Sequence, residues 1–269
     1  MESKVLEGVA DVLRTAAATV VMPRFAALRS EEIEMKAANE PVTIADREAE
    51  VLIGRALRSL LPHARLIGEE ACAAEPSLLD DLSEGTVWII DPIDGTANFA
   101  AGRPPFAMMV ALLQDGESIG SWILDPLRDQ LAVAERGAGA WIDGKRIHVS
   151  AEPVGVGSLR GIVSEAFLPA EQHFLIDRFR TGVGRIEPTA RCAGHEYPLV
   201  ATGERHFALY WRTLVWDHAP GALLLAEAGG SVTHLDGTPY QPARPRSGLL
   251  LAHNAMISED LLGLAQAKD

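Results

Sequence analysis

Two carboxylates three residues apart, Asp91 and Asp94, are the side chains of this sequence whose types and spacing most directly indicate chemistry. They follow the apolar run 87–90, which is typical of a buried strand. Pro92 is expected to end that strand at Asp91, because proline has no N–H to give to a sheet. Two carboxylates this close repel each other in a partly desolvated site unless a cation bridges them. All-oxygen ligands favour a hard ion such as Mg²⁺.

The residues that follow Asp94 offer a ligand of a second kind. Gly95 and Thr96 turn the chain, and we expect a helix to begin there. The free backbone N–H groups at a helix start suit a phosphate. A metal ion next to a phosphate is therefore the hypothesis, and a solvated Asp-Gly turn is the structural alternative.

Three more carboxylates lie at the ends of predicted elements. Glu69 comes at the end of a short predicted strand over 66–70 and could supply a third carboxylate to the same metal site. Asp217 precedes an apolar helix predicted over 219–228, and Pro220 fits the first turn of that helix, where no N–H is needed. Asp46 opens another predicted helix. A carboxylate at a helix start also stabilises that helix as a cap, so capping is the alternative role for both aspartates.

Composition narrows the class of protein. The 269 residues are 48% hydrophobic and 23% charged, as in an ordinary globular protein. The net charge of −13 argues against nucleic acid or an anionic membrane as a partner. No apolar run is long enough to cross a bilayer, and the N-terminus does not have the pattern of a signal peptide. Cys72 and Cys192 are far apart, which excludes a disulfide scaffold and a zinc ribbon, so we expect a cytoplasmic protein.

The pattern of helices and strands changes along the chain. Helical spacing of apolar residues predicts helices over 5–25 and from Asp46 to Leu60. From 106 to 147 short strands alternate with turns, with Asp-Gly at 115–116 and at 143–144. Pro, Gly and Val accumulate over 150–157, which indicates a domain boundary. We therefore predict an α+β unit over residues 1–152 packed against an α/β unit over residues 153–269.

Five segments in order give a resemblance to a known family. They are Val42-Thr43-Ile44-Ala45-Asp46, Ile67-Gly68-Glu69-Glu70, Trp88 to Phe99, Ala138-Gly139-Ala140 with Gly144-Lys145, and Trp216-Asp217-His218-Ala219-Pro220-Gly221 ending in Glu227-Ala228-Gly229-Gly230. The chain resembles the inositol monophosphatase family, within the superfamily that includes fructose-1,6-bisphosphatase. The resemblance implies a layered αβαβα fold of mixed α+β and α/β character, a homodimer, and Mg²⁺-dependent, lithium-sensitive hydrolysis of a phosphate monoester.

The resemblance also implies a role for each residue of the central motifs. Two or three Mg²⁺ ions per active site are expected, the first on Glu69, Asp91 and the backbone carbonyl of Ile93, the second on Asp91, Asp94 and Asp217, with Glu69 also contributing to a weaker third. Gly95 and Thr96 would bind the phosphate through their backbone N–H groups. Asp46, Thr96 and Glu69 are the catalytic residues implied, with the Thr96 hydroxyl, polarised by Asp46, positioning the attacking water.

The substrate end departs from the family pattern. Inositol-hydrolysing members tend to have a glutamate seven residues before the aspartate that matches Asp217, where this chain has Tyr210. Tyrosine and arginine offer a stacking face and a cation in place of a carboxylate. We take Arg191, His195, Tyr210 and Arg212 as candidate substrate contacts, although Tyr210 could equally point into the core.

Four functions remain open at this point. A phosphatase acting on a phosphorylated polyol or sugar such as inositol 1-phosphate is the first. A histidinol-phosphate phosphatase and a 3′-phosphonucleotide phosphatase, acting on adenosine 3′,5′-bisphosphate, are alternatives. A regulatory or binding protein that keeps the fold without turnover is an alternative of another class.

Overall fold

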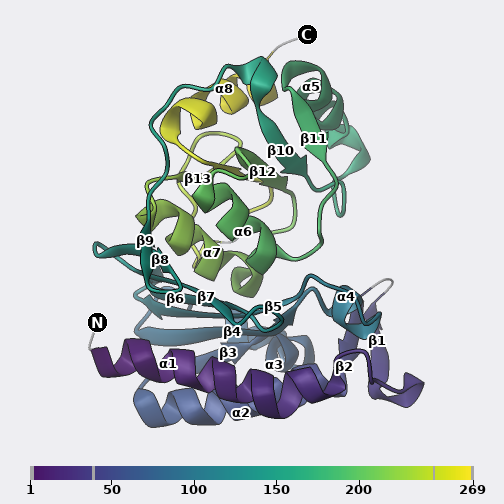
Figure 1. The fold of residues 1–269 in the computed structure, drawn as a ribbon, viewed down its shortest axis with the longest axis vertical. Helices are drawn as coiled ribbons and strands as arrows, with labels where there is room; N and C mark the ends of the chain where they lie inside the picture. The colour runs from purple at the N-terminus through teal and green to yellow at the C-terminus, as the bar shows by residue number, and fades with distance from the viewer. Residues whose placement is uncertain (1–2, 38–39, 245, 268–269) are drawn as a thin grey trace.

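A computed structural model describes residues 3–37, 40–244 and 246–267, which fold into five alternating layers of helices and sheets (Figure 1). Helices α1 (Ser3–Ala16) and α2 (Ile44–Leu60) form the first layer, and a seven-stranded sheet forms the second. Helices α6 (Ala193–Thr202) and α7 (Val215–Glu227) lie between this sheet and a five-stranded sheet. Helices α5 (Phe174–Gly182) and α8 (Ala255–Gln266) cover the far side. The predicted layered αβαβα fold is confirmed.

The seven-stranded sheet has the order β3-β4-β5-β6-β7-β8-β9. Its strands β3 and β4 are parallel and all other neighbours are antiparallel. The strands are β3 (Arg65–Gly68), β4 (Thr86–Asp94), β5 (Ala107–Gln114), β6 (Glu117–Asp125), β7 (Gln130–Glu135), β8 (Gly139–Ile142) and β9 (Lys145–Ile147). The predicted turns are confirmed, because Asp115-Gly116 and Asp143-Gly144 have positive φ at both residues, as two-residue hairpin turns require.

The five-stranded sheet has the order β11-β10-β12-β14-β13. Its strands are β10 (Arg160–Val163), β11 (Arg185–Glu187), β12 (Phe207–Tyr210), β13 (Ser231–His234) and β14 (Leu249–Ala252). Four of the five were predicted, and β11 was not, because it is short and carries two charged residues. A separate hairpin of β1 (Ile33–Ala37) and β2 (Glu40–Thr43) and the short helices α3 (Glu69–Ala74) and α4 (Thr96–Ala100) complete the elements around the site.

Both faces of the seven-stranded sheet are covered, which explains why its central strands are apolar throughout. In β4, Trp88 and Ile90 belong to the core formed with α1 and α2. Val87 and Ile89 belong to a second core that includes residues of α7. Because side chains alternate along a strand, the next odd-numbered residue, Asp91, points to the α7 side.

The expectation that Pro92 ends the strand at Asp91 is wrong. Strand β4 runs on to Asp94, with Asp91 opposite Met109 and Asp94 opposite Ala107 on β5. Two residues on β4, Pro92 and Ile93, therefore lie opposite one residue on β5, Met108, which is a β-bulge. Proline is tolerated because β3 pairs with β4 only as far as Ile90. Since Met109 and Ala107 share one core, the bulge places both carboxylates on the same face of the sheet.

Two further expectations change in detail. Glu69 and Glu70 do not end a strand but form the first turn of α3. Helix α7 begins at Val215, so Asp217 lies in its first turn and Pro220 lies inside the helix rather than in its first turn. The domain boundary near residue 152 stays a prediction, and helices α6 and α7 from beyond it pack on the first sheet. In the described part of the chain, no helix is long and apolar enough to cross a membrane.

Candidate active site

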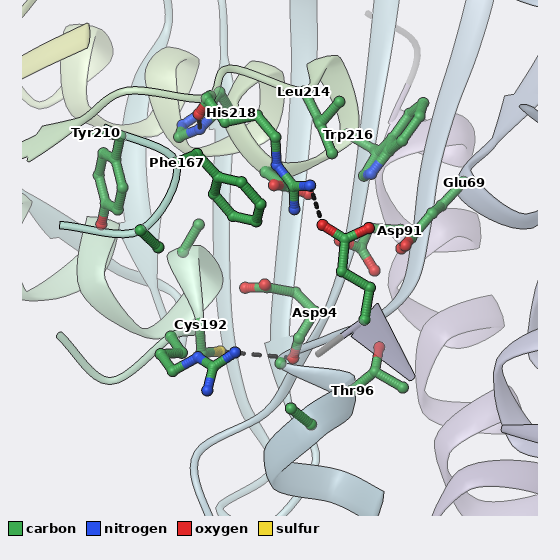
Figure 2. A pocket seen from close by; sticks show the side chains of 18 of the residues that line it. Glu69, Asp91, Asp94, Thr96, Phe167, Cys192, Tyr210, Leu214, Trp216 and His218 are labelled. Carbon is green, nitrogen blue, oxygen red and sulfur yellow. Dashed lines mark hydrogen bonds and ion pairs between the residues drawn. The ribbon is translucent and has the colours of Figure 1, made fainter. Parts of the chain in front are cut away.

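A cavity of about 660 Å³ opens where the end of β4, the start of α7 and the loops of the five-stranded sheet meet. Four of the carboxylates that line it come from three elements: Glu69 at the start of α3 and Asp91 and Asp94 on β4, all labelled in Figure 2, and Asp217 on α7. The four acidic side chains that the sequence analysis assigned to metal ions therefore line one cavity.

Asp91 lies at the centre of this group. It is 1% exposed, and its Oδ1 atom is buried without a hydrogen-bond partner among the described residues. Burial, and then the charges of Glu69, Asp94 and Asp217, raise the pKa of Asp91 well above its usual value. A buried carboxylate oxygen without a donor is costly, and a bound cation would remove that cost.

Asp94 is oriented by the next layer. Its Oδ2 atom accepts a hydrogen bond of 2.6 Å from the backbone N–H of Gly194, at the start of α6. Burial raises the pKa of Asp94 to about 7. Asp217 has no capping hydrogen bond at the start of α7, where Leu214 is the N-cap residue. Burial, followed by the charge of Asp94, raises the pKa of Asp217 well above its usual value. The capping alternative for Asp217 therefore has no support in the geometry.

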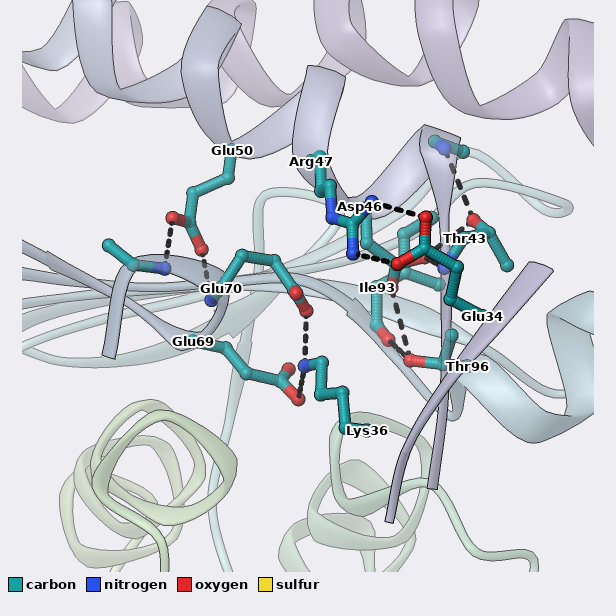
Figure 3. Close-up of polar contacts among 12 residues, drawn as sticks. Glu34, Lys36, Thr43, Asp46, Arg47, Glu50, Glu69, Glu70, Ile93 and Thr96 are labelled. Carbon is teal, nitrogen blue, oxygen red and sulfur yellow. Dashed lines mark hydrogen bonds and ion pairs between the residues drawn. The ribbon is translucent and has the colours of Figure 1, made fainter. Parts of the chain in front are cut away.

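Glu69 is paired with a cation from the β1–β2 hairpin (Figure 3). The Lys36 Nζ atom lies 2.9 Å from Glu69 Oε1 and 2.5 Å from Glu70 Oε1. Within residues 3–37, 40–244 and 246–267, no three His, Cys, Asp or Glu side chains already stand close enough together to hold a metal ion. The residue types fit Mg²⁺, but the carboxylates would have to move closer together to bind it, and Glu69 would have to leave Lys36.

Helix α3 is held at its N-terminus by a residue that the sequence analysis missed. Glu50 on α2 accepts hydrogen bonds from the backbone N–H groups of Glu70 at 2.7 Å and Ala71 at 2.9 Å (Figure 3). These two N–H groups would otherwise be unpaired at the helix start. Glu50 therefore fixes the backbone that carries Glu69. Its place in the middle of a predicted helix gave no signal of this role.

Thr96 and Asp46 meet beside the cavity (Figure 3). The Thr96 hydroxyl lies 3.1 Å from Asp46 Oδ1 and 2.8 Å from the Ile93 carbonyl oxygen. It has one proton, so it donates to one of these acceptors at a time. Asp46 is fully buried and also accepts from the N–H and hydroxyl of Thr43, so it both caps α2 and contacts Thr96. Burial raises the pKa of Asp46 to about 7.

Gly95 forms the turn between β4 and α4. It has a φ of +85°, which glycine adopts without strain. A Cβ atom here would come within 3.1 Å of the Pro105 carbonyl oxygen and 3.2 Å of the Cys192 Cβ. The turn is thus closely packed against the loop that precedes α6, and Gly95 and Thr96 both line the cavity.

The wall away from the carboxylates is aromatic and cationic. It includes Phe167, Arg191, Tyr210, Trp211 and Arg212. Arg212 pairs with Glu40 of β2, and its guanidinium lies 3.7 Å from the centre of the Phe167 ring. The Tyr210 hydroxyl donates to Glu196, a fully buried carboxylate on α6 that the sequence analysis did not select.

His195 does not line this cavity, contrary to its selection as a substrate contact. On α6 its neighbour Glu196 faces the cavity instead. Burial, followed by the charge of Arg128, lowers the pKa of His195. His218 does line it, but both its ring nitrogens are engaged, with the Tyr197 hydroxyl at 3.0 Å and the Arg212 carbonyl oxygen at 3.1 Å. Burial lowers the pKa of His218 to about 4, so it is neutral and supports the segment that carries Arg212.

Comparison with known proteins covers the whole molecule. Residues 1–268 match the model of the inositol monophosphatase family. The chain is 34% identical over 216 residues to the Nus factor SuhB of Pseudomonas aeruginosa, covering 77% of this chain and 76% of the relative. It is 35% identical over 230 residues to a histidinol-phosphatase of Chlorobaculum parvum, covering 85% of each. The solved structure of the Thermotoga maritima IMPase aligns with a TM-score of 0.81 at 26% identity, covering 97% of this chain and 96% of that one. The likeness thus extends over both sheets.

Proposed function

Because this chain belongs to the inositol monophosphatase family, we propose that it is a Mg²⁺-dependent phosphatase that hydrolyses a small phosphate monoester in the cavity between β4 and α7. The buried, unpartnered Oδ1 atom of Asp91, among three other carboxylates on one cavity, is the observation that carries the proposal. Glu69, Asp91, Asp94, Asp217 and the Ile93 carbonyl would hold the cations. Divalent ions at such a site supply a nucleophile at neutral pH and neutralise charge on the phosphate and the leaving oxygen.

Residues of the chain would bind the phosphate and position the attacking water. The backbone N–H groups of Gly95 and Thr96 would bind the phosphate oxygens. The Thr96 hydroxyl, which donates a hydrogen bond to Asp46 or to the Ile93 carbonyl, keeps lone pairs that can accept a hydrogen bond from the attacking water. Transfer of a water proton to Thr96 would be balanced by transfer of the Thr96 proton to Asp46. Asp46 is oriented by Thr43 and holds the Thr96 hydroxyl in place. Cys72 and Cys192 are buried, and neither takes part in this chemistry.

A phosphorylated polyol or sugar, such as inositol 1-phosphate, is the first substrate class we propose. Histidinol phosphate is the second, because a relative of 35% identity is a histidinol-phosphatase and the wall formed by Phe167, Tyr210 and Trp211 offers aromatic faces. A 3′-phosphonucleotide is a third class that such a wall suits. The relative called a Nus factor keeps a non-catalytic regulatory role open as the alternative of another class.

Phosphate release from inositol 1-phosphate, histidinol phosphate, fructose 1,6-bisphosphate and adenosine 3′,5′-bisphosphate tests the proposal. We expect turnover with Mg²⁺, none with a chelator, and recovery when Mg²⁺ is restored. The ranking of kcat/KM identifies the substrate class. Absence of phosphate release from every compound in excess Mg²⁺ would favour the non-catalytic role.

Three finer expectations stay predictions. Li⁺ is expected to inhibit turnover by competing for a Mg²⁺ position. A homodimer is expected by analogy with the family, and light scattering in solution would test it. A cytoplasmic location is expected from the cysteine content.

A further inference from the structure

The loop 189–192 contains a strained residue next to the proposed phosphate site. Arg191 has a φ of +56°, in the left-handed region that residues other than glycine, asparagine and aspartate rarely adopt. The loop packs against the phosphate turn, because a Cβ on Gly95 would lie 3.2 Å from the Cys192 Cβ and 3.4 Å from the Arg191 carbonyl oxygen. Backbone strain of this kind persists only where the surrounding structure imposes it, and it concentrates at functional sites.

Glu196 holds the backbone of this loop through hydrogen bonds. Its Oε1 atom accepts hydrogen bonds from the Thr189 hydroxyl at 2.8 Å and from the Ala190 N–H at 2.5 Å. The Thr189 hydroxyl in turn accepts a bond of 2.9 Å from the Arg191 N–H. The Oε2 atom accepts from the Tyr210 hydroxyl. A fully buried carboxylate thus joins the loop that carries Arg191 to the strand that carries Tyr210.

A second side chain holds the loop from the opposite side. The Asn98 Nδ2 group of α4 donates to the Ala190 carbonyl at 2.9 Å and to the Pro105 carbonyl at 2.9 Å. Both backbone polar groups of Ala190 are therefore held by side chains, the N–H by Glu196 and the carbonyl by Asn98. Arg191 follows directly, with its backbone direction set by both.

The side chain presented in this way is a cation on the cavity wall. Arg191 lines the cavity, and no carboxylate among the described residues pairs with its guanidinium. Arg212, the other arginine of this wall, is already paired with Glu40 and stacked on Phe167. Glu196 itself has its acceptor atoms engaged by three donors, so it is not available to bind the hydroxyl groups of a polyol.

We propose that Glu196 is a positioning residue that locks Arg191 on the cavity wall as the receptor for a second anionic group, a carboxylate or a phosphate, carried by the alcohol part of the substrate. The guanidinium offers paired N–H donors that match either anion. This inference rests on the proposed phosphatase function. It adds that the substrate has an anionic group besides the phosphate that is released.

Two pairs of substrates test the proposal with the full-length protein in Mg²⁺. Glycerol 2-phosphate and 2-phosphoglycerate differ by a carboxylate, and adenosine 3′-monophosphate and adenosine 3′,5′-bisphosphate differ by a phosphate. We expect a KM about tenfold lower for the charged member of at least one pair, as a charge-assisted hydrogen bond provides. The pair that shows the difference identifies the source of the anion.

The variants Arg191→Gln, Glu196→Ala and Glu196→Gln separate the roles. The KM ratio is the KM of the member without the extra anion divided by the KM of the member that carries it. Arg191→Gln and Glu196→Ala are each expected to bring this ratio close to one for the pair that shows the difference. Glu196→Gln keeps an acceptor for Thr189 and Ala190, and it is expected to retain most of the wild-type ratio. Arg185→Gln, at an exposed arginine of β11 outside the cavity, is the matched control and should leave the ratio unchanged.

Other results would contradict the role of Arg191, the role of Glu196 or the phosphatase function. A wild-type KM ratio near one in both pairs, or a ratio that Arg191→Gln does not change, overturns the role of Arg191. If Glu196→Ala lowers kcat and the melting temperature for all substrates but preserves the ratio, Glu196 is structural only. If no compound is hydrolysed, the proposed phosphatase function fails, and the ratio of calorimetric Kd values within each pair tests Arg191 in its place.

Discussion

Asp91 shows how single residues prepare this site for a cation. Its carboxylate is almost fully buried, has one oxygen without a donor, and faces the charges of Glu69, Asp94 and Asp217. Each of these features destabilises the ionised form when no cation is present. The folded protein therefore keeps an acidic cluster that a divalent ion would stabilise.

The variant Asp91→Asn is expected to lose Mg²⁺ binding. Its amide removes one buried negative charge, so the melting temperature in a chelator should be no lower than that of the wild type. Mg²⁺ should raise the melting temperature of the wild type but not of the variant, and Mg²⁺ affinity should fall more than about 100-fold, beyond the loss typical of outer-shell changes. Thermal unfolding with and without Mg²⁺ measures this, and an equal Mg²⁺ shift in both proteins would exclude Asp91 as a ligand.

The variant Thr96→Ala separates water positioning from metal binding. Removing the hydroxyl that bonds to Asp46 should lower kcat by about 10²–10⁴-fold, the range of a general acid–base contribution, with KM nearly unchanged. Thr96→Ser keeps the hydroxyl and should recover most of the rate. Steady-state kinetics measures both. If Thr96→Ala instead abolished the Mg²⁺-induced rise in melting temperature, Thr96 would be part of the metal site.

At the same scale, sequence reasoning found residue types but not all of their contacts. The spacing of Asp91 and Asp94 indicated a metal site, and both line the cavity with Glu69 and Asp217. The contact between Glu196 and Tyr210 was missed, because one lies on a helix and the other on a strand of another layer. His195 was selected for its chemistry, but its place on α6 turns it away from the cavity. Tertiary packing decides such cases.

At the scale of elements, the bulge in β4 and the capped start of α3 set the geometry. The bulge between Asp91 and Asp94 puts both side chains on the face that α7 covers. Glu50 closes the N-terminus of α3, whose first residue is Glu69. These devices explain how residues separated in the chain line one cavity.

The variant Glu50→Ala tests the second device. Loss of a helix cap should lower the free energy of unfolding by about 1 kcal/mol, and Mg²⁺ affinity should fall because the backbone of Glu69 is less fixed. Glu48 lies on the same helix as Glu50 and forms an exposed ion pair with Arg24. The variant Glu48→Ala should therefore change the free energy of unfolding by less than about 0.5 kcal/mol. Denaturant unfolding and Mg²⁺ calorimetry measure the two quantities. A Mg²⁺ affinity equal to that of the Glu48→Ala control would show that the cap does not support the site.

Elements were predictable where local rules dominate. The hairpin turns at 115–116 and 143–144 followed from Asp-Gly dipeptides, and α2 followed from its apolar spacing. The extension of β4 past Pro92 was not predictable, because it depends on where β3 stops pairing. Pro220 was expected in the first turn of a helix, but α7 begins at Val215, so Pro220 lies within the helix.

At the scale of the whole molecule, buried acids link stability to pH. The pKa values of Asp46 and Glu50 are both raised to about 7, chiefly by burial. Between their ordinary values near 4 and pH 7, the folded chain holds protons that the unfolded chain has released. Stability from these groups is therefore fully present below about pH 4 and is lost as pH rises through 7.

The free energy of unfolding of the metal-free protein is accordingly expected to decrease between pH 5 and about pH 8. In Glu50→Gln, which has no titrating group at this position, the decrease should be smaller. Denaturant titrations in a chelator at several pH values measure the slope. Identical slopes for the wild type and Glu50→Gln would contradict the role given to Glu50.

Binding of divalent ions by the four carboxylates is the central claim, and anomalous diffraction from crystals soaked in Mn²⁺ tests it most directly. Mn²⁺ peaks are expected within coordination distance of Asp91, with Asp94, Asp217 and Glu69 completing the ligands and Lys36 displaced from Glu69. Mn²⁺ bound only elsewhere, with these four side chains directed away from any ion, would contradict it.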